Sequence, residues 1–185
     1  MEDKLNYSDK TIEPFAIEII SASYNPIYKE FHWNKKADDF DFVHYDLGIG
    51  LEVSVIISAN TQKVVAYQNS FRKDINSIRG AKTNENGDLS AWYGGSGLEL
   101  RRLIIDRIHT KNAKAQKHIS NIISECHLCL CIDDGGWFQR AEEFDFLKTI
   151  NSVSKTIFSK IFIVTSSLFL VYEKQEITTY ERKYP

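Results

Sequence analysis

Residues 37–58 read ADDFDFVHYDLGIGLEVSVIIS, and this stretch predicts the centre of the fold. Two β-strands, expected at Asp39–Asp46 and Ile49–Ser58, are joined by a tight turn that contains Gly48. Glu52 stands in the middle of the second, otherwise apolar strand. A carboxylate is costly to bury there unless a cation or a hydrogen-bond donor binds it. Glu52 is therefore the first candidate for a functional residue, and a divalent metal is the partner we expect.

Length and composition limit the remaining interpretations. The 185 residues fit a single domain spanning 1–185, and 43% of them are hydrophobic. The net charge of −2 provides no global basic field for nucleic acid, so any such surface must be a local patch. No apolar run is long enough to cross a membrane, and the acidic N-terminus does not resemble a secretory signal. We expect a cytoplasmic protein without a membrane partner.

The rest of the chain alternates helical and extended patterns. Apolar residues at helical spacing predict helices over Thr11–Tyr24, Leu98–Ser124 and Phe138–Ser159. Short apolar runs predict strands at His127–Ile132, Lys160–Ser166 and Leu168–Glu173. Three segments stay open: 27–36 as a short helix or irregular arm, 60–78 as strand or helix, and 177–185 as edge strand or frayed end. This order predicts an α/β fold whose mixed central β-sheet is flanked by helices.

The order of elements and the acidic hairpin resemble the restriction-endonuclease-like superfamily, also called the PD-(D/E)xK nucleases. In that family an Asp near the start of one strand precedes Glu-x-Lys or Asp-x-Lys in the next. Here Asp41 lies eleven residues before Glu52-Val53-Ser54. The segments 37–43 and 48–54 are similar to the two motif strands.

The helix that contains Arg107–Lys111 and the strand at 127–132 are similar to the family's long helix and fourth strand. The resemblance covers roughly residues 11–135 and implies an αβββαβ core. Residues 136–185 would then be an added C-terminal helix and strands.

The resemblance implies hydrolysis of phosphodiester bonds in DNA or RNA with Mg²⁺ or Mn²⁺. Mg²⁺ prefers hard oxygen ligands, which Asp41, Glu52 and the carbonyl of Val53 would supply. Asp39 competes with Asp41 because it has the same strand parity, and Glu18 would reach the same edge. Alternatively, the acidic residues form a solvated strand edge and Glu52 pairs with a nearby Arg.

Ser54 stands where the family has its catalytic Lys, and a hydroxyl supplies no positive charge. Arg101 and Lys111 on the long helix are the positions from which a cation would replace it. The same helix carries Arg102, Arg107, Lys114 and Lys117, which we assign to nucleic-acid binding. The alternative is that these cations form an ordinary solvated helix face.

Two other groups of residues are weaker candidates for a functional site. Cys126, Cys129 and Cys131 alternate along one strand without a second ligand pair, so we expect buried cysteines rather than a zinc site. Ser54 as a nucleophile would need a histidine base, but His44 has the opposite parity to Asp41.

A second class of function remains open. The chain would then be a non-catalytic interaction protein on the same fold, such as an inhibitor, an immunity protein or a defence-related partner. Trp92, Tyr93, Trp137 and Phe138 would be its contact anchors. A protein partner or a homodimer is the corresponding expectation.

Overall fold

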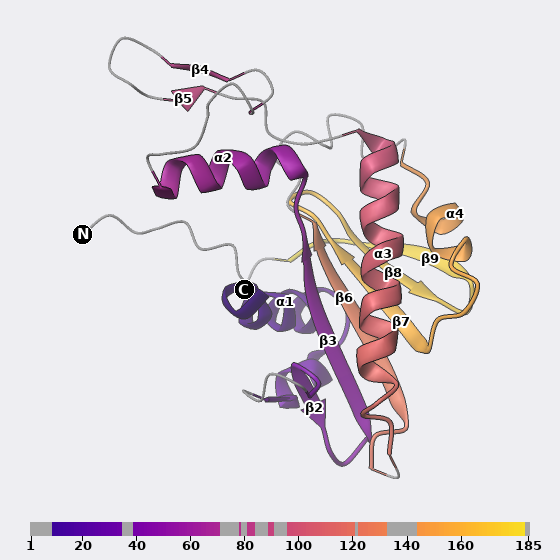
Figure 1. Ribbon diagram of the computed structural model, residues 1–185. Helices are drawn as coiled ribbons and strands as arrows, with labels where there is room; N and C mark the ends of the chain where they lie inside the picture. The colour runs from indigo at the N-terminus through magenta and orange to yellow at the C-terminus, as the bar shows by residue number, and fades with distance from the viewer. Residues whose placement is uncertain are drawn as a thin grey trace.

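One mixed β-sheet of seven strands organises the protein, in the order β1-β2-β3-β6-β7-β8-β9 (Figure 1). The computed structural model describes residues 9–34, 39–70, 78, 81–83, 89–90, 96–120, 122–132 and 144–183. Strands β3, β6 and β7 run parallel to one another, and the remaining neighbours in this sheet pair antiparallel. The predicted α/β class with a mixed sheet flanked by helices is confirmed.

The N-terminal half supplies a helix, the acidic hairpin and a second helix. Its elements are α1 (Asp9–Ser23), the 3₁₀ helix η1 (Pro26–Glu30), β1 (His32–Trp33), β2 (Phe42–His44), β3 (Ile49–Ile56) and α2 (Ala59–Ser70). The segment 60–78, left open between strand and helix, thus begins as a helix. The Ser58 hydroxyl accepts a hydrogen bond from the N–H of Thr61 at 2.9 Å, as an N-cap residue does.

The C-terminal half completes the sheet. Its elements are β4 (Lys82–Thr83), β5 (Leu89–Ser90), α3 (Gly97–Ala115), β6 (Glu125–Ile132), α4 (Phe146–Asn151), β7 (Phe158–Val164), β8 (Phe169–Glu173) and β9 (Glu176–Tyr180). β4 and β5 form a separate two-stranded sheet. β9 is an edge strand of the main sheet, so the first of the two alternatives for residues 177–185 holds for its start. None of the helices in the described ranges is both long and apolar enough to cross a membrane.

Two predicted helices are too long. The helix expected to reach Ser124 ends at Ala115, and Ile119 and Ile122 are 45% and 64% exposed instead of buried. The Ser120 hydroxyl accepts hydrogen bonds from the N–H groups of Ile122 and Ile123, so a turn replaces further helix.

The helix expected over Phe138–Ser159 shortens to α4 within the described residues. Asp145 caps its N-terminus by accepting a hydrogen bond from the N–H of Lys148 at 2.7 Å. Phe146, Ile150 and Val153 are nevertheless buried, as their periodicity predicted. The proposed anchors Trp92, Tyr93, Trp137 and Phe138 lie outside the described residues.

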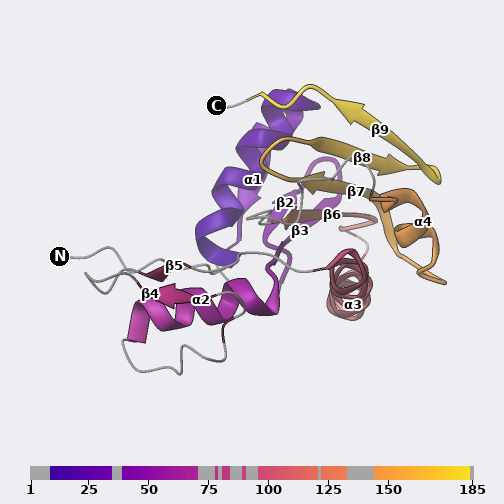
Figure 2. The same cartoon turned by 90° about the horizontal axis from the view of Figure 1, so that it is seen from above.

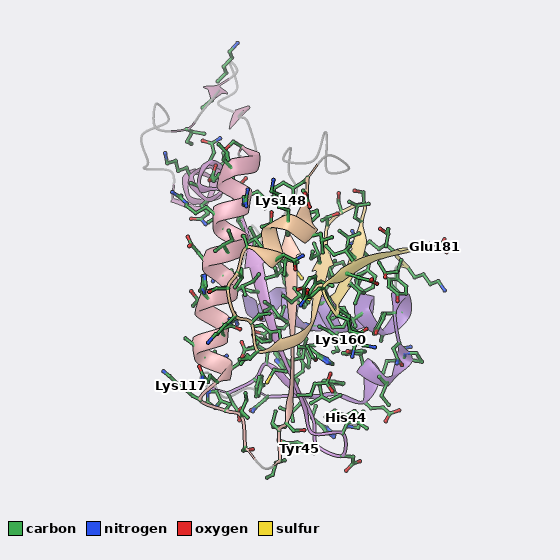
Figure 3. The ribbon with its side chains drawn as sticks, turned by 90° about the vertical axis from the view of Figure 1, so that its right-hand side faces the viewer. His44, Tyr45, Lys117, Lys148, Lys160 and Glu181 are labelled. Carbon is green, nitrogen blue, oxygen red and sulfur yellow. The ribbon has the colours of Figure 1, made fainter. Side chains whose placement is uncertain are left out.

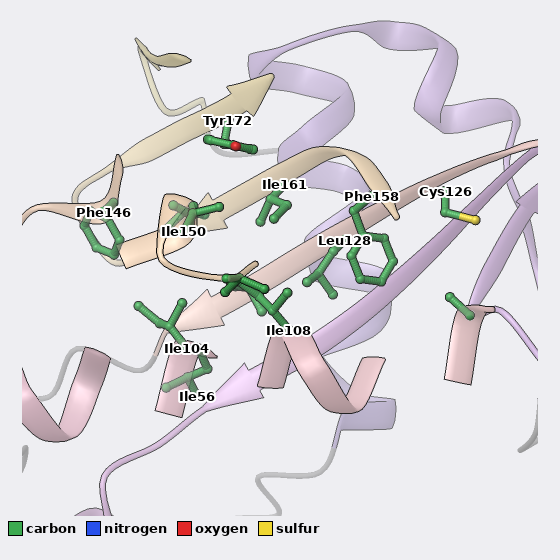
Figure 4. Close-up of a cluster of buried hydrophobic side chains, with 14 of the residues drawn as sticks. Ile56, Ile104, Ile108, Cys126, Leu128, Phe146, Ile150, Phe158, Ile161 and Tyr172 are labelled. Carbon is green, nitrogen blue, oxygen red and sulfur yellow. The ribbon is translucent and has the colours of Figure 1, made fainter. Parts of the chain in front are cut away.

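Helices α3 and α4 cover one face of the sheet (Figure 2). Ile104 and Ile108, one turn apart on α3, are fully buried in a cluster with Leu128 of β6 and Ile161 of β7, as Figure 4 shows. Burying such a side chain contributes about 1.5–3 kcal/mol. This apolar stripe therefore fixes the rotation of α3 about its axis, and with it the polar residues that face β3.

Helix α1 covers the opposite face. Ile19 and Ile20 pack there with Leu51 and Val53 of β3. Because side chains alternate along a strand, Glu52 points to the other face, toward α3.

The hairpin between β2 and β3 depends on two glycines. Gly48 adopts a φ of +64°, which favours glycine, and a Cβ there would meet the carbonyl oxygen of Ile122 at 2.7 Å. Gly50 lies directly beneath the ring of Phe40, and a Cβ would approach three ring atoms at 2.6–2.7 Å. Phe40 is fully buried, so the ring has little room to move.

We therefore expect Gly50→Ala to lower the free energy of unfolding by about 1–3 kcal/mol, because overpacking shifts Phe40 or the hairpin. Urea denaturation measures this difference. Gly97→Ala is the matched control, since among the described residues its Cβ in the first turn of α3 would meet Phe144 alone, at an ordinary contact distance of 3.9 Å. That variant should be neutral or slightly stabilising. Equal stability losses in both variants would contradict the role of Phe40.

Candidate functional site

The acidic hairpin brings two carboxylates side by side. β2 and β3 pair Phe42 with Leu51 and Val43 with Gly50. One further step in this register places Asp41 opposite Glu52 on the same face. The N–H of Val53 donates to Oδ2 of Asp41 at 2.7 Å, which holds this side chain at the end of the ladder.

Two lysines from α3 meet these carboxylates. Nζ of Lys111 lies 2.6 Å from Oε2 of Glu52 and 3.5 Å from Oδ2 of Asp41. Nζ of Lys114 lies 2.9 Å from Oε1 of Glu52 and 3.7 Å from Oδ1 of Asp41. We call Asp41, Glu52, Lys111 and Lys114 the carboxylate–lysine quartet. Its formal charges sum to zero, because two carboxylates face two ammonium groups.

The quartet is largely removed from solvent, but unevenly. The side chain of Glu52 is 0% exposed, that of Lys111 is 10% exposed and that of Lys114 is 25% exposed. Burial raises the pKa of Glu52; Lys111 opposes this shift by its charge, while the negative charge of Asp41 adds to it. An ionised Glu52 is thus held at an electrostatic cost, a condition common at functional sites.

Two buried oxygens beside α3 lack hydrogen bonds within the described part of the chain. One is Oε1 of Glu52, although Nζ of Lys114 is 2.9 Å away, and the other is Oγ of Ser54. Ser54 is two residues beyond Glu52 on the same strand and has the same parity. An incompletely satisfied oxygen in a buried site is a position at which a further cation or donor gains free energy.

Lys111 and Lys114 belong to a longer row along α3. Arg107, Lys111 and Lys114 follow the helical spacing of four and three residues, so they share one side of α3, and His118 follows in the turn after the helix ends at Ala115. Arg107 donates from Nη2 to the carbonyl oxygen of Val55 at 3.4 Å. Nδ1 of His118 lies 3.8 Å from Oδ1 of Asp39. We call these four residues the cationic stripe, which runs beside β3 and the start of β2.

The structure separates the two cation candidates. Lys111 contacts the carboxylates. Arg101 lies near the N-terminal end of α3 and lines a pocket with Asp145, Lys148 and Asn151. Lys114, assigned to nucleic-acid binding, instead pairs with Glu52. Arg102 and Lys117 are exposed, and Figure 3 shows Lys117 near the C-terminal end of α3.

Two acidic candidates lie elsewhere. Asp39 accepts hydrogen bonds from the N–H of Phe40 and from Nδ2 of Asn34, both at 2.8 Å, and so stabilises the start of the hairpin. Glu18 is exposed on α1, which covers the opposite face of the sheet from Glu52. The prediction that Glu18 reaches this site is therefore wrong.

The donor set suits a hard divalent cation. Two carboxylates and a strand carbonyl offer the oxygen ligands that Mg²⁺ and Mn²⁺ take, and Oε1 of Glu52 accepts no hydrogen bond among the described residues, although it is paired with Lys114. Among the described residues, no three His, Cys, Asp or Glu side chains gather as a metal site. Any metal here would therefore be held by Asp41, Glu52, backbone and water, and would compete with the two ammonium groups.

A second buried polar cluster lies on the α1 face. The Tyr28 hydroxyl and Nδ1 of His127 are 2.9 Å apart, and Nε2 of His127 lies 2.9 Å from Oε1 of Glu125. Ser159 donates to the same oxygen of Glu125 at 2.6 Å. Burial lowers the pKa of His127 to about 4, while the hydrogen bond from Ser159 lowers the pKa of Glu125 to about 2. A neutral His127 accepts from Tyr28 and donates to Glu125, a connected network that supports the fold.

The cysteines and His44 behave as expected. Cys126 is buried on the α3 face, while Cys129 and Cys131 are buried on the α1 face, so strand alternation separates them. His44 faces away from the quartet, with Nε2 3.5 Å from Oε2 of Glu30.

We expect Glu52→Gln to leave the melting temperature at pH 7.5 unchanged or raised without metal, because the amide avoids the cost of burying a charge. The raised pKa of Glu52 fixes the pH dependence. Below the unfolded pKa of 4.5, Glu52 of the wild type is protonated and its burial has no electrostatic cost. Above the raised folded pKa, Glu52 is ionised and the full cost of burying its charge lowers the free energy of unfolding. The advantage of Glu52→Gln should therefore grow from pH 4.5 to pH 7.5 in calorimetry. A clear loss at pH 7.5 would show Glu52 to be a structural ion-pair partner.

His127 predicts a different acid response. Its folded pKa of about 4 lies below its ordinary value of 6.5, so stability is complete above pH 6.5 and is lost as the pH falls toward 4. The shift corresponds to about 3 kcal/mol. His127→Gln should weaken this pH dependence in urea titrations, while His109→Gln, at an exposed position of α3, should leave it unchanged. Identical pH profiles for all three proteins would contradict the assignment.

Comparisons with known proteins add no relative. The chain matches no protein-family model, no curated protein and no solved structure. The geometry of the quartet and of the surrounding elements is therefore what a functional proposal rests on.

Proposed function

We propose that this protein is a divergent restriction-endonuclease-like nuclease that hydrolyses phosphodiester bonds of DNA or RNA with Mg²⁺ or Mn²⁺. The observation that carries the proposal is the convergence of Asp41, Glu52 and Lys111 at one point beside α3. Two carboxylates and one lysine are the residue types that the family motif supplies. Here the lysine comes from the helix instead of from the second motif strand.

The arrangement of elements supports the same proposal. Omitting η1, α2 and the small β4–β5 sheet, the chain runs α1, β1, β2, β3, α3 and β6. This order agrees with the helix, three strands, helix and strand that the proposal requires. β6 pairs parallel to β3, so α3 is the crossover between two adjacent parallel strands. This crossover is what places Lys111 above Glu52.

Each residue has a role that follows from its position. Asp41 and Glu52 would hold the metal, which when bound polarises the phosphate and lowers the pKa of a water molecule. Val53 fixes Asp41 through its N–H group. Lys111 would supply the positive charge that offsets negative charge gathering on the phosphate. Ser54 lies two residues beyond Glu52 on the same face and stands where the family has its catalytic lysine; its hydroxyl supplies no positive charge, so Lys111 takes that role in the proposal.

The surface around the quartet suits a polyanion. Arg107 and His118 extend the cationic stripe on both sides of the two lysines, and Lys117 is exposed beside it. The quartet itself is neutral, so the further positive charge on this side of α3 comes from Arg107 and Lys117, although the chain as a whole carries −2. Phosphate contacts of this kind bind DNA or RNA without reading its sequence.

A non-catalytic interaction protein is the second candidate. The observation that favours it is the charge balance of the quartet, in which both carboxylates already have ammonium partners. A quartet of this kind can also serve as a buried polar anchor between α3 and the hairpin.

We expect the wild type to cleave at least one of single- and double-stranded DNA and RNA in Mn²⁺. Lys111→Ala should lower the rate by roughly a hundredfold or more, because one preorganised cation is lost. Arg101→Ala is the matched control, since it removes a charge from the same helix without touching the quartet, and it should retain activity. Gel assays on all four substrates measure these rates.

Glu52→Ala distinguishes the activity of this site from that of contaminating nucleases, and added chelator tests whether the cleavage depends on metal. Cleavage that survives Glu52→Ala does not come from this site. A wild type inert on all four substrates would overturn the enzyme proposal in favour of the interaction protein. Equal losses in Arg101→Ala and Lys111→Ala would overturn the assignment of Lys111.

A further inference from the structure

We propose that Lys114 occupies the position of the metal ion and leaves it when a divalent cation binds. The protein would thus carry its own competitor for the site, an ammonium group that is exchanged for Mg²⁺ or Mn²⁺. This inference rests on the proposed function, because it assumes that Asp41 and Glu52 hold a metal.

The first argument is the position of the Lys114 ammonium. Its Nζ lies between the two carboxylates, 2.9 Å from Oε1 of Glu52 and 3.7 Å from Oδ1 of Asp41. It also donates to Oε2 of Glu52 at 3.1 Å. A cation held by both acidic side chains occupies the place that a bridging metal requires.

The second argument is that Oε1 of Glu52 accepts no hydrogen bond among the described residues, despite its short distance to Lys114. The ammonium group balances the charge of this oxygen from 2.9 Å in an ion pair that lacks the alignment of a hydrogen bond. Glu52 is entirely buried, so the oxygen has no water-exposed alternative. A metal ion needs no donor hydrogen and can approach this lone pair directly.

The third argument distinguishes Lys114 from Lys111. Lys111 is the more buried of the two, at 10% against 25%, and makes the shorter contact to Glu52, at 2.6 Å. Moving Lys111 into water would therefore break the shorter and more buried of the two ion pairs with Glu52. Lys114, one turn nearer the end of the helix, needs only a change of side-chain rotamer to reach water.

Exchange also satisfies the charge balance. With both lysines in place, a divalent ion would raise the site from neutral to +2. When Lys114 leaves, the ion, Lys111 and two carboxylates sum to +1, which suits a phosphate. The released Lys114 remains on the cationic stripe beside Arg107 and His118, where a phosphate of the substrate backbone would be its new partner.

Calorimetric titration with Mn²⁺ at pH 7.5 tests the exchange. Lys114→Ala should bind Mn²⁺ roughly tenfold to a hundredfold more tightly than the wild type, because a competing charge has been removed. Lys117→Ala is the matched control: it removes the same charge from an exposed position one turn further on, and its affinity should stay within about twofold. Absence of Mn²⁺ binding in every protein would overturn the proposed function. Binding by the wild type that Lys114→Ala does not strengthen would overturn only the exchange.

Acetylation of the wild type, followed by mass spectrometry, tests which lysine moves. Saturating Mg²⁺ should increase the labelling of Lys114 severalfold and leave Lys111 protected, with exposed Lys117 as the internal standard. A Lys114 that stays protected under saturating metal, or a Lys111 that becomes labelled in its place, would contradict the proposal. Because this measurement uses the unaltered chain, a folding defect in a variant cannot produce its result.

Discussion

The complete burial of Glu52, which requires a cation within reach, is the constraint that links the hairpin, α3 and the parallel pair β3–β6. A carboxylate that is 0% exposed in the middle of a sheet is tolerable only if charge and hydrogen bonds reach it. Lys111 and Lys114 provide both, and they do so from a helix whose rotation is set by its buried isoleucines. Apolar packing of α3 and the pairing of β2, β3 and β6 thus together bring the two lysines to the buried carboxylate. On one face of β3, α1 provides apolar packing, and on the other face α3 provides the cations.

Much of the hairpin could be predicted from the sequence, because its rules are local. Strand parity places Asp41 and Glu52 on one face, and glycine marks the turn. The ends of the long helix could not be predicted from periodicity, because Ser120 redirects the backbone through two hydrogen bonds that periodicity does not see. The short α4 has the same cause, since the Asp145 cap and the following turn fix its length.

The site was only partly predictable for a related reason. Helix phase limited the cation to Arg101 or Lys111, but the choice depends on how far along β3 the helix lies, and tertiary packing decides that. Lys114 was placed among the solvent-facing cations because its Cα lies on the flank of α3. A lysine has a long flexible stem, so its charged end reaches a carboxylate that its backbone position does not suggest. The sequence held one signal for its role: Lys114 follows Lys111 by three residues, which places the two on the same side of a helix.

The sequence separation within the quartet has a consequence for how the chain folds. Asp41 and Glu52 meet through a short turn, whereas Lys111 lies 59 residues beyond Glu52. Hairpins close within microseconds, while a contact across such a span must first overcome the entropy of a long loop. We therefore expect the hairpin to form with its two carboxylates facing water and α3 to neutralise them later. Contacts made after the transition state mainly change the rate of unfolding, so we expect substitutions of Lys111 or Lys114 to act on that rate more than on the rate of folding.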